Sequence, residues 1–461
     1  MILSIDCGST NHKVGLFDET LERRAVCSTP VAYSVRDGKH AEIDAERLWQ
    51  DTISLIAQAC SLAGVATEDV NTIALASQAQ TFTIVDSVGQ PIMPFISWAD
   101  KRAVRESAEL ERALGKEFHF RSSFPAPVPQ LQLAKLAWIR RNHPERLVLG
   151  NKIASLPSFL ALRLAGLHVT DANLAAMSGL YSCVEKEWWA AALQACGVRD
   201  DQMGELVPVG HAVDARCGSP RLKFASPFRI VFAGNDQTAG AYANASRAGG
   251  LVVTLGTALV AYRYAGESPG PFHPTSCWGP YPGGGFYELA TFDEGCSALD
   301  WAVEQVMPGA EREFIELAQC GPPGASFFYP QQMHTDSAWL GEARVVSRAR
   351  AVLEGICFRT RQLLEVGLKA DLDSLPLTVI GGGSQSDGWL QILANVLNCP
   401  LRRGSGDNLL GAAMMARPAL RPPCLDTGPL MEPTASTARS YDSIYRLWLA
   451  NMPQHQTREH G

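Results

Sequence analysis

The sequence predicts an α/β protein built from two similar halves, on three observations. Its 461 residues exceed the size at which a single hydrophobic core usually stops growing. Strand-like and helix-like patterns alternate over the first 100 residues, which is typical of a partly parallel sheet. A strand, a glycine turn and a second strand occur at residues 1–17 and again at residues 251–264, which indicates an internal duplication.

The first strand pair is predicted at residues 1–5 and 14–17, around a turn at Gly8. A carboxylate, Asp6, precedes this turn and a base, Lys13, follows it. Glycine turns expose backbone N–H groups, and such groups can bind phosphate. Asp6 can then hold Mg²⁺ beside a phosphate whose charge Lys13 offsets. The structural alternative is an aspartate that caps its own turn.

The rest of the N-terminal half continues the alternation. Asp44 can cap a helix that runs to Ala63, because apolar residues recur there at helical spacing. Residues 72–86 predict two strands interrupted by a short polar group. Residues 103–213 are predicted to be mostly helical, with a proline-rich break.

The C-terminal half repeats the pattern. Residues 228–245 predict a buried strand, an Asn-Asp turn and a helix of small residues. In the hairpin at residues 251–264, Gly256 aligns with Gly8 of the first hairpin. Two similar halves with facing glycine hairpins would form a cleft.

The last part of the chain predicts a third glycine turn. Residues 377–401 predict a strand, three glycines and a helix with an apolar stripe. Further helices are predicted at residues 408–416 and 441–448. The three glycine turns together predict a nucleotide site. A P-loop is excluded because GxxxxGK[ST] is absent, and the N-terminal hairpin lacks GxGxxG, which disfavours a dinucleotide site.

Four polar residues at strand ends are candidates for chemistry. Asp236 can accept the proton of an attacking hydroxyl, as phosphoryl transfer requires, and it can also serve as a helix N-cap. Gln78, Gln80 and Asp100 can hydrogen-bond a polyol. Each of these three can equally be a buried polar group paired within the protein.

The composition excludes several classes of protein. A net charge of −7 argues against a nucleic-acid-binding surface. The twelve cysteines are scattered without zinc spacing, which predicts free thiols in a reducing compartment. The most apolar uncharged run, residues 248–262, is too short to span a membrane. No signal-peptide pattern is visible, and we expect a cytoplasmic protein.

With these motifs the chain resembles the FGGY carbohydrate kinases, which phosphorylate sugars and polyols with ATP on two actin-like (ribonuclease-H-like) domains. The resemblance covers nearly the whole chain. The matching positions fall into two phosphate motifs, a W-x-D-x-R element, a catalytic aspartate and an adenosine motif: Asp6, Gly8, Ser9 and Lys13; Gly256, Thr257 and Ala258; Trp98, Asp100 and Arg102; Asp236; Gly381, Gly382, Gly383, Ser386, Trp389, Gln391 and Ala394.

The resemblance implies a sugar-binding domain at residues 1–243, a nucleotide-binding domain at residues 244–461, and an ATP/sugar cleft between them. Asp236 is the implied catalytic base, and Asp6 the implied Mg²⁺ ligand. The phosphates of ATP would bind Gly8, Ser9, Thr10, Lys13, Gly256 and Thr257, and its adenine would pack against Gly381, Gly382, Gly383 and Ser386. The sugar would lie near Gln78, Gln80, Trp98 and Asp100.

Three departures from the family pattern bear on the substrate. Gln78-Ala79-Gln80-Thr81 replaces the Gln-Met-His-Gly of xylulose kinases, residues 327–344 lack a Glu-Arg pair, and Asn395 replaces a common Asp. We expect a pentulose substrate, xylulose or ribulose. The alternatives are a kinase of glycerol, of a deoxyhexulose such as fuculose or rhamnulose, or of autoinducer-2, and a non-catalytic actin-like ATP-binding sensor. A monomer or a homodimer is expected.

Overall fold

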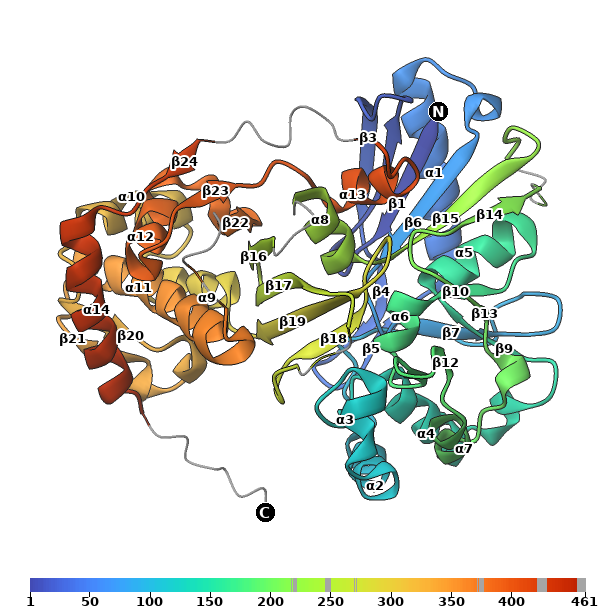
Figure 1. Ribbon diagram of the computed structural model, residues 1–461, viewed down its shortest axis with the longest axis horizontal. Coiled ribbons are helices and arrows are strands. Elements are labelled where there is room, and N and C mark those ends of the chain that lie inside the picture. The colour runs from blue at the N-terminus through green and yellow to red at the C-terminus, as the bar shows by residue number, and fades with distance from the viewer. Residues whose placement is uncertain are drawn as a thin grey trace. The chain divides into compact units, whose positions relative to one another are not determined.

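A computed structural model describes residues 1–216, 218, 222–244, 250–268, 270, 272–370, 372, 377–420 and 429–453. The chain divides into two compact units (Figure 1). The first unit comprises Met1–Asn244, Tyr264–Glu288 and Gly406–Leu425, and the second comprises Ala245–Arg263, Leu289–Ser405 and Asp426–Gly461. Mixed sheets with helices packed on them confirm the predicted α/β class.

The main sheet of the first unit has six strands in the order β14-β15-β6-β1-β2-β3. Their bounds are Ile2–Cys7 (β1), Asn11–Phe17 (β2), Arg23–Pro30 (β3), Thr72–Ser77 (β6), Ala212–Ala215 (β14) and Phe228–Asn235 (β15). β1 and β15 both run parallel to β6, and Cys7 and Asn235 both pair with Ser77. The carboxyl ends of these three strands therefore meet at one edge of the sheet.

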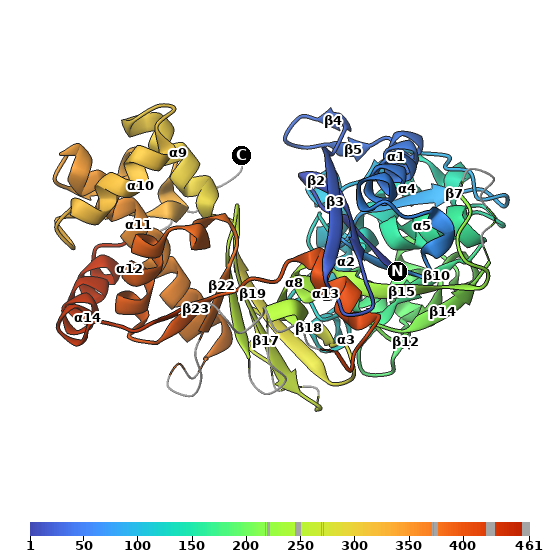
Figure 2. The same ribbon diagram turned by 90° about the horizontal axis from the view of Figure 1, so that it is seen from above.

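The central strand β1 is buried on both faces because helices cover both sides of it. Leu3 and Ile5 join the core that contains residues of α1 (Ala45–Ala63). Ser4 points to the other face, where its hydroxyl donates to the carbonyl oxygen of Leu409 in α13 (Asn408–Met415) at 2.8 Å. Figures 1 and 2 show α13, from late in the chain, beside these first strands.

The predicted helix after Asp44 is confirmed. Its first residue is Ala45 and its last is Ala63, and the Asp44 carboxylate accepts a hydrogen bond from the backbone N–H of Arg47 at 2.8 Å. This contact is a standard N-cap, which satisfies one of the free N–H groups of the first turn.

The prediction of a mostly helical stretch at residues 103–213 is wrong in part, because short strands alternate with the helices. The helices are α2 (Val104–Leu114), α3 (Glu117–Ser122), α4 (Gln132–Asn142), α5 (Leu156–Ala165), α6 (Ala172–Ala176) and α7 (Ala190–Cys196). The strands are β9 (Lys152–Ser155), β10 (Val169–Asp171), β11 (Tyr181–Ser182), β12 (Glu187–Trp188) and β13 (Glu205–Val207). Strands this short contain too few residues to display an alternating pattern.

A second sheet of the first unit has five strands in the order β4-β5-β8-β7-β9. Its remaining strands are β4 (Tyr33–Arg36), β5 (Ala41–Ile43), β7 (Phe82–Val85) and β8 (Phe95–Ile96). β6 and β7 are the two strands predicted at residues 72–86, and the loop between them contains the predicted polar group.

The second large sheet has the order β18-β19-β17-β16-β22-β23-β24. Its strands are β16 (Leu251–Leu255), β17 (Leu259–Gly266), β18 (Cys277–Pro280), β19 (Phe286–Phe292), β22 (Leu377–Ile380), β23 (Leu401–Arg403) and β24 (Leu430–Met431). β16 pairs antiparallel with β17 and parallel with β22, as β1 pairs with β2 and β6. This repeated pairing confirms the predicted duplication of the hairpin.

Helices and one small hairpin complete the second unit. The helices are α9 (Cys296–Val306), α10 (Glu311–Cys320), α11 (Val345–Gln362), α12 (Asp387–Leu397) and α14 (Ala435–Ala450), and the hairpin is β20 (Ser326–Phe328) with β21 (Trp339–Gly341). α14 is longer than the helix predicted at residues 441–448. Asn395 accepts the backbone N–H of Thr434 at 2.7 Å, which anchors the segment before α14.

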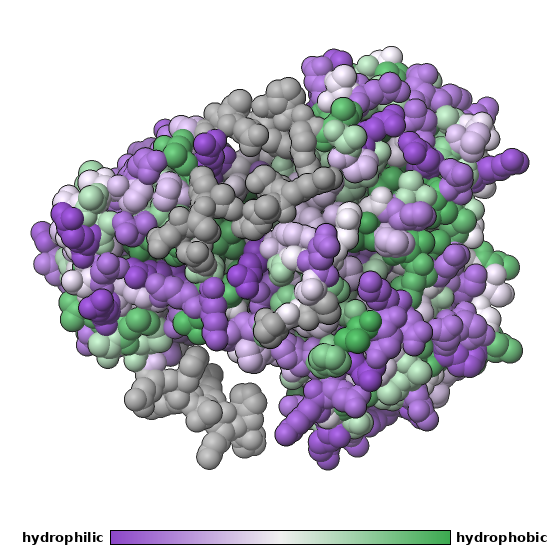
Figure 3. Space-filling model, in the orientation of Figure 1, coloured by the Kyte–Doolittle hydropathy of each residue, from purple (hydrophilic) through white to green (hydrophobic). Residues whose placement is uncertain are grey.

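The surface and the cysteines add two observations. Among the described residues, no helix is both long and apolar enough to cross a membrane. On the face drawn in Figure 3, apolar residues form scattered patches among polar ones. The cysteines in the described part of the chain are all free thiols.

Candidate active site

The edge where β1, β6 and β15 end brings together three of the predicted residues. Asp6 lies near the end of β1, Gln78 follows β6, and Asp236 follows β15 as the first residue of α8 (Asp236–Asn244). In an α/β sheet, ligands bind beyond the carboxyl ends of parallel strands. The strand order therefore creates the candidate site from segments that are far apart in the sequence.

The turn between β1 and β2 is held in a fixed conformation by its neighbours. A Cβ atom on Gly8 would lie 2.8 Å from the carbonyl oxygen of Asn11, so this position requires glycine. The Tyr33 hydroxyl donates to the carbonyl oxygen of Ser9 at 3.0 Å. The Gln78 side-chain amide donates to the carbonyl oxygen of Gly8 at 3.1 Å. Thr10, the last residue of the turn, is exposed.

Asp6 is a buried carboxyl group with one unused oxygen. Its side chain is 2 % exposed. Oδ2 accepts from the side-chain amide of Asn408 at 3.2 Å, whereas Oδ1 has no hydrogen-bond partner in the part of the chain that the structure describes. Burial, followed by the charge of Asp236, raises the pKa of Asp6 to about 7.

Lys13 is the basic neighbour of both aspartates. It pairs with Asp6 across the β1–β2 hairpin, so the two side chains lie on the same face of the sheet. Its charge lowers the pKa of Asp6 and that of Asp236, but less than burial raises them. The structure thus brings two carboxyl groups and one ammonium group within electrostatic reach of each other.

Asp236 is not the N-cap of α8, which corrects the structural alternative considered from the sequence. Asn235 takes that role, because its side-chain oxygen accepts the backbone N–H of Thr238 at 2.9 Å. Asn173 fixes Asn235 in turn, accepting its side-chain N–H at 2.6 Å. The Asp236 carboxylate accepts the adjacent backbone N–H of Gln237 at 2.8 Å. Burial raises the pKa of Asp236 to about 6.

The residues around Asp6 fit Mg²⁺. This ion binds proteins through one or two carboxylates and keeps water and phosphate oxygens as its other ligands. The unpartnered Oδ1 of Asp6 is a suitable oxygen ligand, and a cation there would relieve the repulsion between Asp6 and Asp236. No cluster of three or more His, Cys, Asp or Glu side chains in the described part of the chain could hold a metal alone, which suits an ion that depends on phosphate.

The predicted sugar-binding residues differ in their accessibility. Gln80 is partly exposed and has a left-handed backbone conformation, with φ at 60°. Trp98 is 42 % exposed and its backbone N–H donates to the Thr81 hydroxyl at 3.0 Å. Gln78 is buried, and its amide nitrogen is used by the Gly8 turn. Gln80 and Trp98 are therefore the accessible members of this group.

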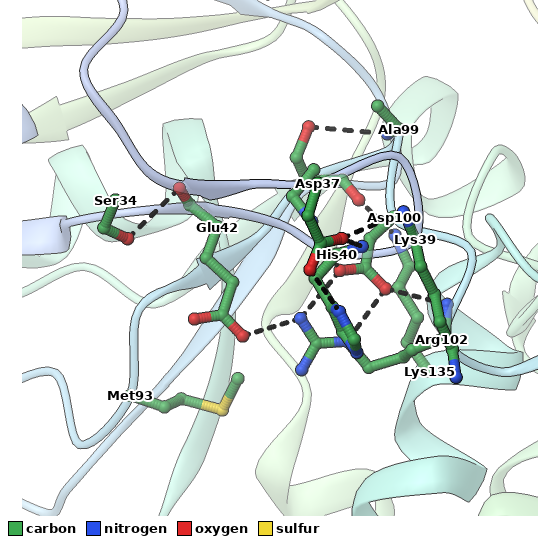
Figure 4. Close-up of polar contacts among 12 residues, drawn as sticks. Ser34, Asp37, Lys39, His40, Glu42, Met93, Ala99, Asp100, Arg102 and Lys135 are labelled. Atoms are coloured by element: carbon green, nitrogen blue, oxygen red, sulfur yellow. Dashed lines mark hydrogen bonds and ion pairs between the residues drawn. The ribbon is translucent and has the colours of Figure 1, made fainter.

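The contacts of Asp100 support the structural alternative for this residue, a buried polar group paired within the protein. It is fully buried, and Oδ1 accepts from the backbone N–H and the Nε of Arg102 at 3.0 and 2.8 Å. Oδ2 accepts from the backbone N–H of Ala41 at 2.8 Å and from Nη2 of Arg102 at 2.7 Å. Figure 4 shows the guanidinium held between Asp100 and Glu42. Neither oxygen is left for a sugar hydroxyl.

A small void lies beside two of the predicted sugar-binding residues, Gln78 and Gln80. Its volume is about 10 Å³, and Gln78, Gln80 and Thr81 line part of it. A void of this size holds about one water molecule, so a sugar does not fit inside it. An acceptor would have to lie on the accessible side of Gln80 and Trp98.

In the second unit, two of the predicted glycine turns pack together. The turn at Gly256 and Thr257 is fixed by the start of α9, since the backbone N–H of Cys296 donates to the carbonyl oxygen of Gly256 at 2.6 Å. Gly381 has φ at 95°, and a Cβ atom there would lie 2.5 Å from the carbonyl oxygen of Leu255. The glycine at 381 thus lets the third turn contact the end of β16.

A cavity of about 690 Å³ lies beside the third glycine turn. This volume is in the range of small-molecule sites. One wall contains Gly382, Gly383, Ser386 and Trp389, and the residues of the opposite wall come from α9, α10 and the loop between them: Cys296, Leu299, Gly309, Glu311, Arg312, Glu313, Ile315, Glu316 and Gln319. Ser386 also caps α12, accepting the backbone N–H of Trp389 at 3.3 Å.

The sequence analysis missed several residues of the two sites. Asn408, which binds Asp6, lies 402 positions further along the chain. Asn173, which fixes Asn235, lies 62 positions before it. The α10 residues that line the cavity show only an ordinary amphipathic helix pattern. No local motif distinguishes any of them, because their roles depend on contacts between distant segments.

Comparisons with known proteins identify the family of this chain. Residues 1–242 match the N-terminal domain, and residues 251–420 the C-terminal domain, of the FGGY family of carbohydrate kinases. A xylulose kinase of Escherichia coli K12 is 25% identical over 92% of this chain and 90% of its own length. A glycerol kinase of Brucella ovis is 27% identical over 90% of this chain and 89% of its own length.

Solved structures show the same fold at lower identity. The ligand-bound xylulose kinase of Lactobacillus acidophilus has a TM-score of 0.87 at 19% identity, with 97% of each chain covered. The glycerol kinase of Plasmodium falciparum, solved with ADP, has a TM-score of 0.84 at 16% identity, with 98% of each chain covered.

Proposed function

The chain belongs to the FGGY family of carbohydrate kinases, and we propose that it transfers the γ-phosphate of ATP to a terminal hydroxyl of a ketopentose, xylulose or ribulose. The observation on which this proposal rests is the pair Asp6 and Asp236 at the edge where β1, β6 and β15 end, next to the accessible amide of Gln80. The proposal includes a cytoplasmic location, where ATP is available.

Asp236 is the proposed catalytic base. With a pKa of about 6 it is mostly ionised at neutral pH, and it is still basic enough to accept a proton from a hydroxyl as the new O–P bond forms. Because Asn235 caps the helix, the carboxylate of Asp236 is not needed as the N-cap of α8. Lys13 stabilises negative charge in the same region.

The turns at Gly8 and Gly256 are the proposed phosphate-binding elements, through their backbone N–H groups. Asp6 would hold Mg²⁺ by its unpartnered Oδ1, with Asn408 orienting the other oxygen. Bound there, Mg²⁺ would neutralise the charge that develops on the phosphates during transfer. The first unit thus contains the proposed base, metal ligand and acceptor residues.

The 690 Å³ cavity of the second unit is the proposed site for the adenosine part of ATP. Gly382 is exposed and lets a ligand approach the backbone closely, whereas the indole of Trp389 is fully buried against Gly383. Among the charged residues of the lining, Arg312 pairs with Glu316 at 3.0 Å, and the carboxylates of Glu311 and Glu313 keep the balance negative. This negative balance disfavours phosphate groups in the cavity, so the phosphates would extend out of it.

The proposed acceptor is neutral. Gln80 and Trp98 offer an amide and an indole, which suit hydroxyl and carbonyl groups rather than a carboxylate. The full-length similarity to a xylulose kinase supports a ketopentose. Glycerol is the second candidate, because several relatives of similar identity and coverage are glycerol kinases. An amide can bind the hydroxyls of either molecule.

Release of ADP from Mg·ATP tests this function across ketopentoses, deoxyketohexoses, glycerol, pentitols and gluconate. We expect saturable turnover with a ketopentose and no turnover with Asp236→Asn. Preference for glycerol would replace the first candidate by the second. Preference for gluconate would refute the neutral acceptor site, and no turnover on any acceptor would refute the proposal as a whole.

A further inference from the structure

Lys135 is a fully buried lysine of α4 with an unusual set of partners. Its Nζ donates to the carbonyl oxygen of Gln80 at 2.9 Å and to the carbonyl oxygen of Ser97 at 2.9 Å. Lysine is seldom completely buried, because removing an ammonium group from water is costly unless every N–H finds an acceptor. A methionine or leucine would fill this space without that cost. The hydrogen bonds of the amine are therefore the feature that distinguishes lysine at this position.

The two carbonyl groups belong to the two segments that carry the accessible acceptor residues. Gln80 is itself the left-handed residue of the β6–β7 loop, and Ser97 immediately precedes Trp98 in the loop after β8. A residue other than glycine at φ 60° is disfavoured, so a hydrogen bond to its carbonyl group helps to hold it there. Lys135 is thus a bridge between these two loops.

Other contacts link the same loops but do not replace this bridge. The backbone N–H of Trp98 donates to the Thr81 hydroxyl at 3.0 Å. The backbone N–H of Asp100 donates to the carbonyl oxygen of Ser97 at 3.1 Å, so Ser97 serves both Lys135 and Asp100. The first bond joins the two loops and the second lies within the loop after β8, whereas Lys135 binds a carbonyl group of each loop.

Lys135 acts as a hydrogen-bond donor rather than as a partner in the neighbouring ion pair. Figure 4 places it beside Asp100 and Arg102. The oxygens of Asp100 are already engaged by Arg102 and by the N–H of Ala41. Burial lowers the pKa of Lys135 to about 7. The charge of Asp100 raises this pKa, and the charge of Arg102 lowers it further. The amine and the ammonium form both have enough N–H groups for two carbonyl acceptors.

We propose that Lys135 is a positioning residue that sets the spacing of Gln80 and Trp98 and thereby the affinity for the acceptor. The bridge itself follows from the contacts above, and its effect on affinity rests on the proposed function. Lys135 does not touch the acceptor, because it is fully buried beneath the two loops.

The bridge is tested by hydrogen exchange, which does not depend on activity. Lys135→Met removes the donors and leaves an unbranched side chain one atom shorter. We expect amide exchange in residues 79–82 and 97–100 to become about tenfold faster. In the variant the two hydrogen bonds are absent, so local opening of the loops costs less free energy. Glu106→Gln is the matched control: Glu106 is buried on α2 and pairs with Arg141 of α4 at 2.6 Å, away from both loops.

Steady-state kinetics test the effect on the acceptor. For Lys135→Met we expect the KM of the acceptor to rise about tenfold while the KM of ATP stays unchanged, and Lys135→Arg to recover most of the loss. Glu106→Gln should lower the thermal stability without changing the ratio of the two KM values. If Lys135→Met does not fold, Lys135→Leu, which also lacks a donor, provides the same two measurements with a shorter side chain.

Unchanged exchange in both loops would overturn the bridge. Faster exchange with an unchanged acceptor KM would overturn the positioning role, as would an equal rise of both KM values. If the wild-type protein turns over no acceptor, the proposed function fails, and the exchange measurement still decides whether the bridge exists.

Discussion

Replacing Asp236 by asparagine is expected to abolish activity and to stabilise the folded protein. The side chain keeps its size and loses its charge. In the folded state burial raises the pKa of Asp236 from 3.8 to about 6. The folded protein therefore holds this proton more tightly than the unfolded chain does, and ionisation of Asp236 costs stability as the pH rises from about 4 to about 6. Asparagine does not ionise and avoids that cost.

The size of the effect follows from the same shift. A rise of about 2 units corresponds to roughly 3 kcal/mol as an upper limit. Asp236 is partly exposed, and solvent screening reduces this to roughly 1–2 kcal/mol. The gain should be small at pH 4, grow up to about pH 6 and stay constant above. For a unit of this size it corresponds to a rise in Tm of about 2–6 °C.

Activity should change in the opposite direction. Loss of the base is expected to lower kcat by roughly 10²–10⁴-fold, with the affinity for ATP little affected. For the wild-type protein, kcat should fall about tenfold per pH unit below pH 6, because protonated Asp236 cannot accept the hydroxyl proton. The measurements are thermal unfolding at pH 4 and pH 7.5 and ADP release between pH 5 and pH 8.

The control is Asp37→Asn, where hydrogen bonds from His40 and Lys39 lower the pKa of the carboxyl group to about 2. The pKa of Asp37 is lowered where that of Asp236 is raised, so ionised Asp37 stabilises the fold. Asp37→Asn should therefore lose stability at pH 7.5 and keep its activity. A destabilised Asp236→Asn at pH 7.5 would refute the argument from burial. Retained turnover in that variant would refute its role as the base.

Four further variants test the other parts of the two sites. Asp6→Asn should raise the Mg²⁺ concentration needed for half-maximal activity at least tenfold, measured by titration with Mg²⁺, since a neutral amide is a poor ligand for this ion; an unchanged requirement would contradict the metal site. Gly381→Ala should lower Tm and raise the KM of ATP, because its Cβ would overlap a backbone oxygen, whereas Gly382→Ala, with no atom within 4 Å of the added Cβ, should keep the Tm of the wild type. Asp100→Asn should cost roughly 3 kcal/mol of stability in denaturant titrations, because it removes one of the two carboxylates that pair with the buried Arg102, and equal midpoints would contradict a structural role. Although burial opposes it, the pKa of Asp100 is lowered in the folded state, mainly by its hydrogen bonds with Arg102 and Ala41. The wild-type protein should therefore lose the stability that ionised Asp100 contributes as the pH falls through this pKa.

Much of the fold could be predicted because the relevant signals are local. The hairpin around Gly8 and the helix after Asp44 are specified by residues a few positions apart, and both are confirmed. The short strands between residues 152 and 215 were missed, since two to four residues do not show a period. The boundary between the two predicted domains stays a prediction, as does the cleft between them.

The sequence by itself determined the α/β class, the duplicated hairpin and the family, because glycine turns, N-caps and alternating apolar residues act over short distances. Only the tertiary structure decided which polar residues are free to act. In the sequence, Asp100 and Asp236 are both aspartates that follow predicted strands. In the structure, Asp100 is paired with Arg102, whereas Asp236 is not needed as a helix cap because Asn235 takes that role. The environment of Asp6 depends in the same way on Asn408, 402 positions away. Burial and hydrogen-bond partners are properties of packed surfaces, and chain segments distant in the sequence supply those surfaces.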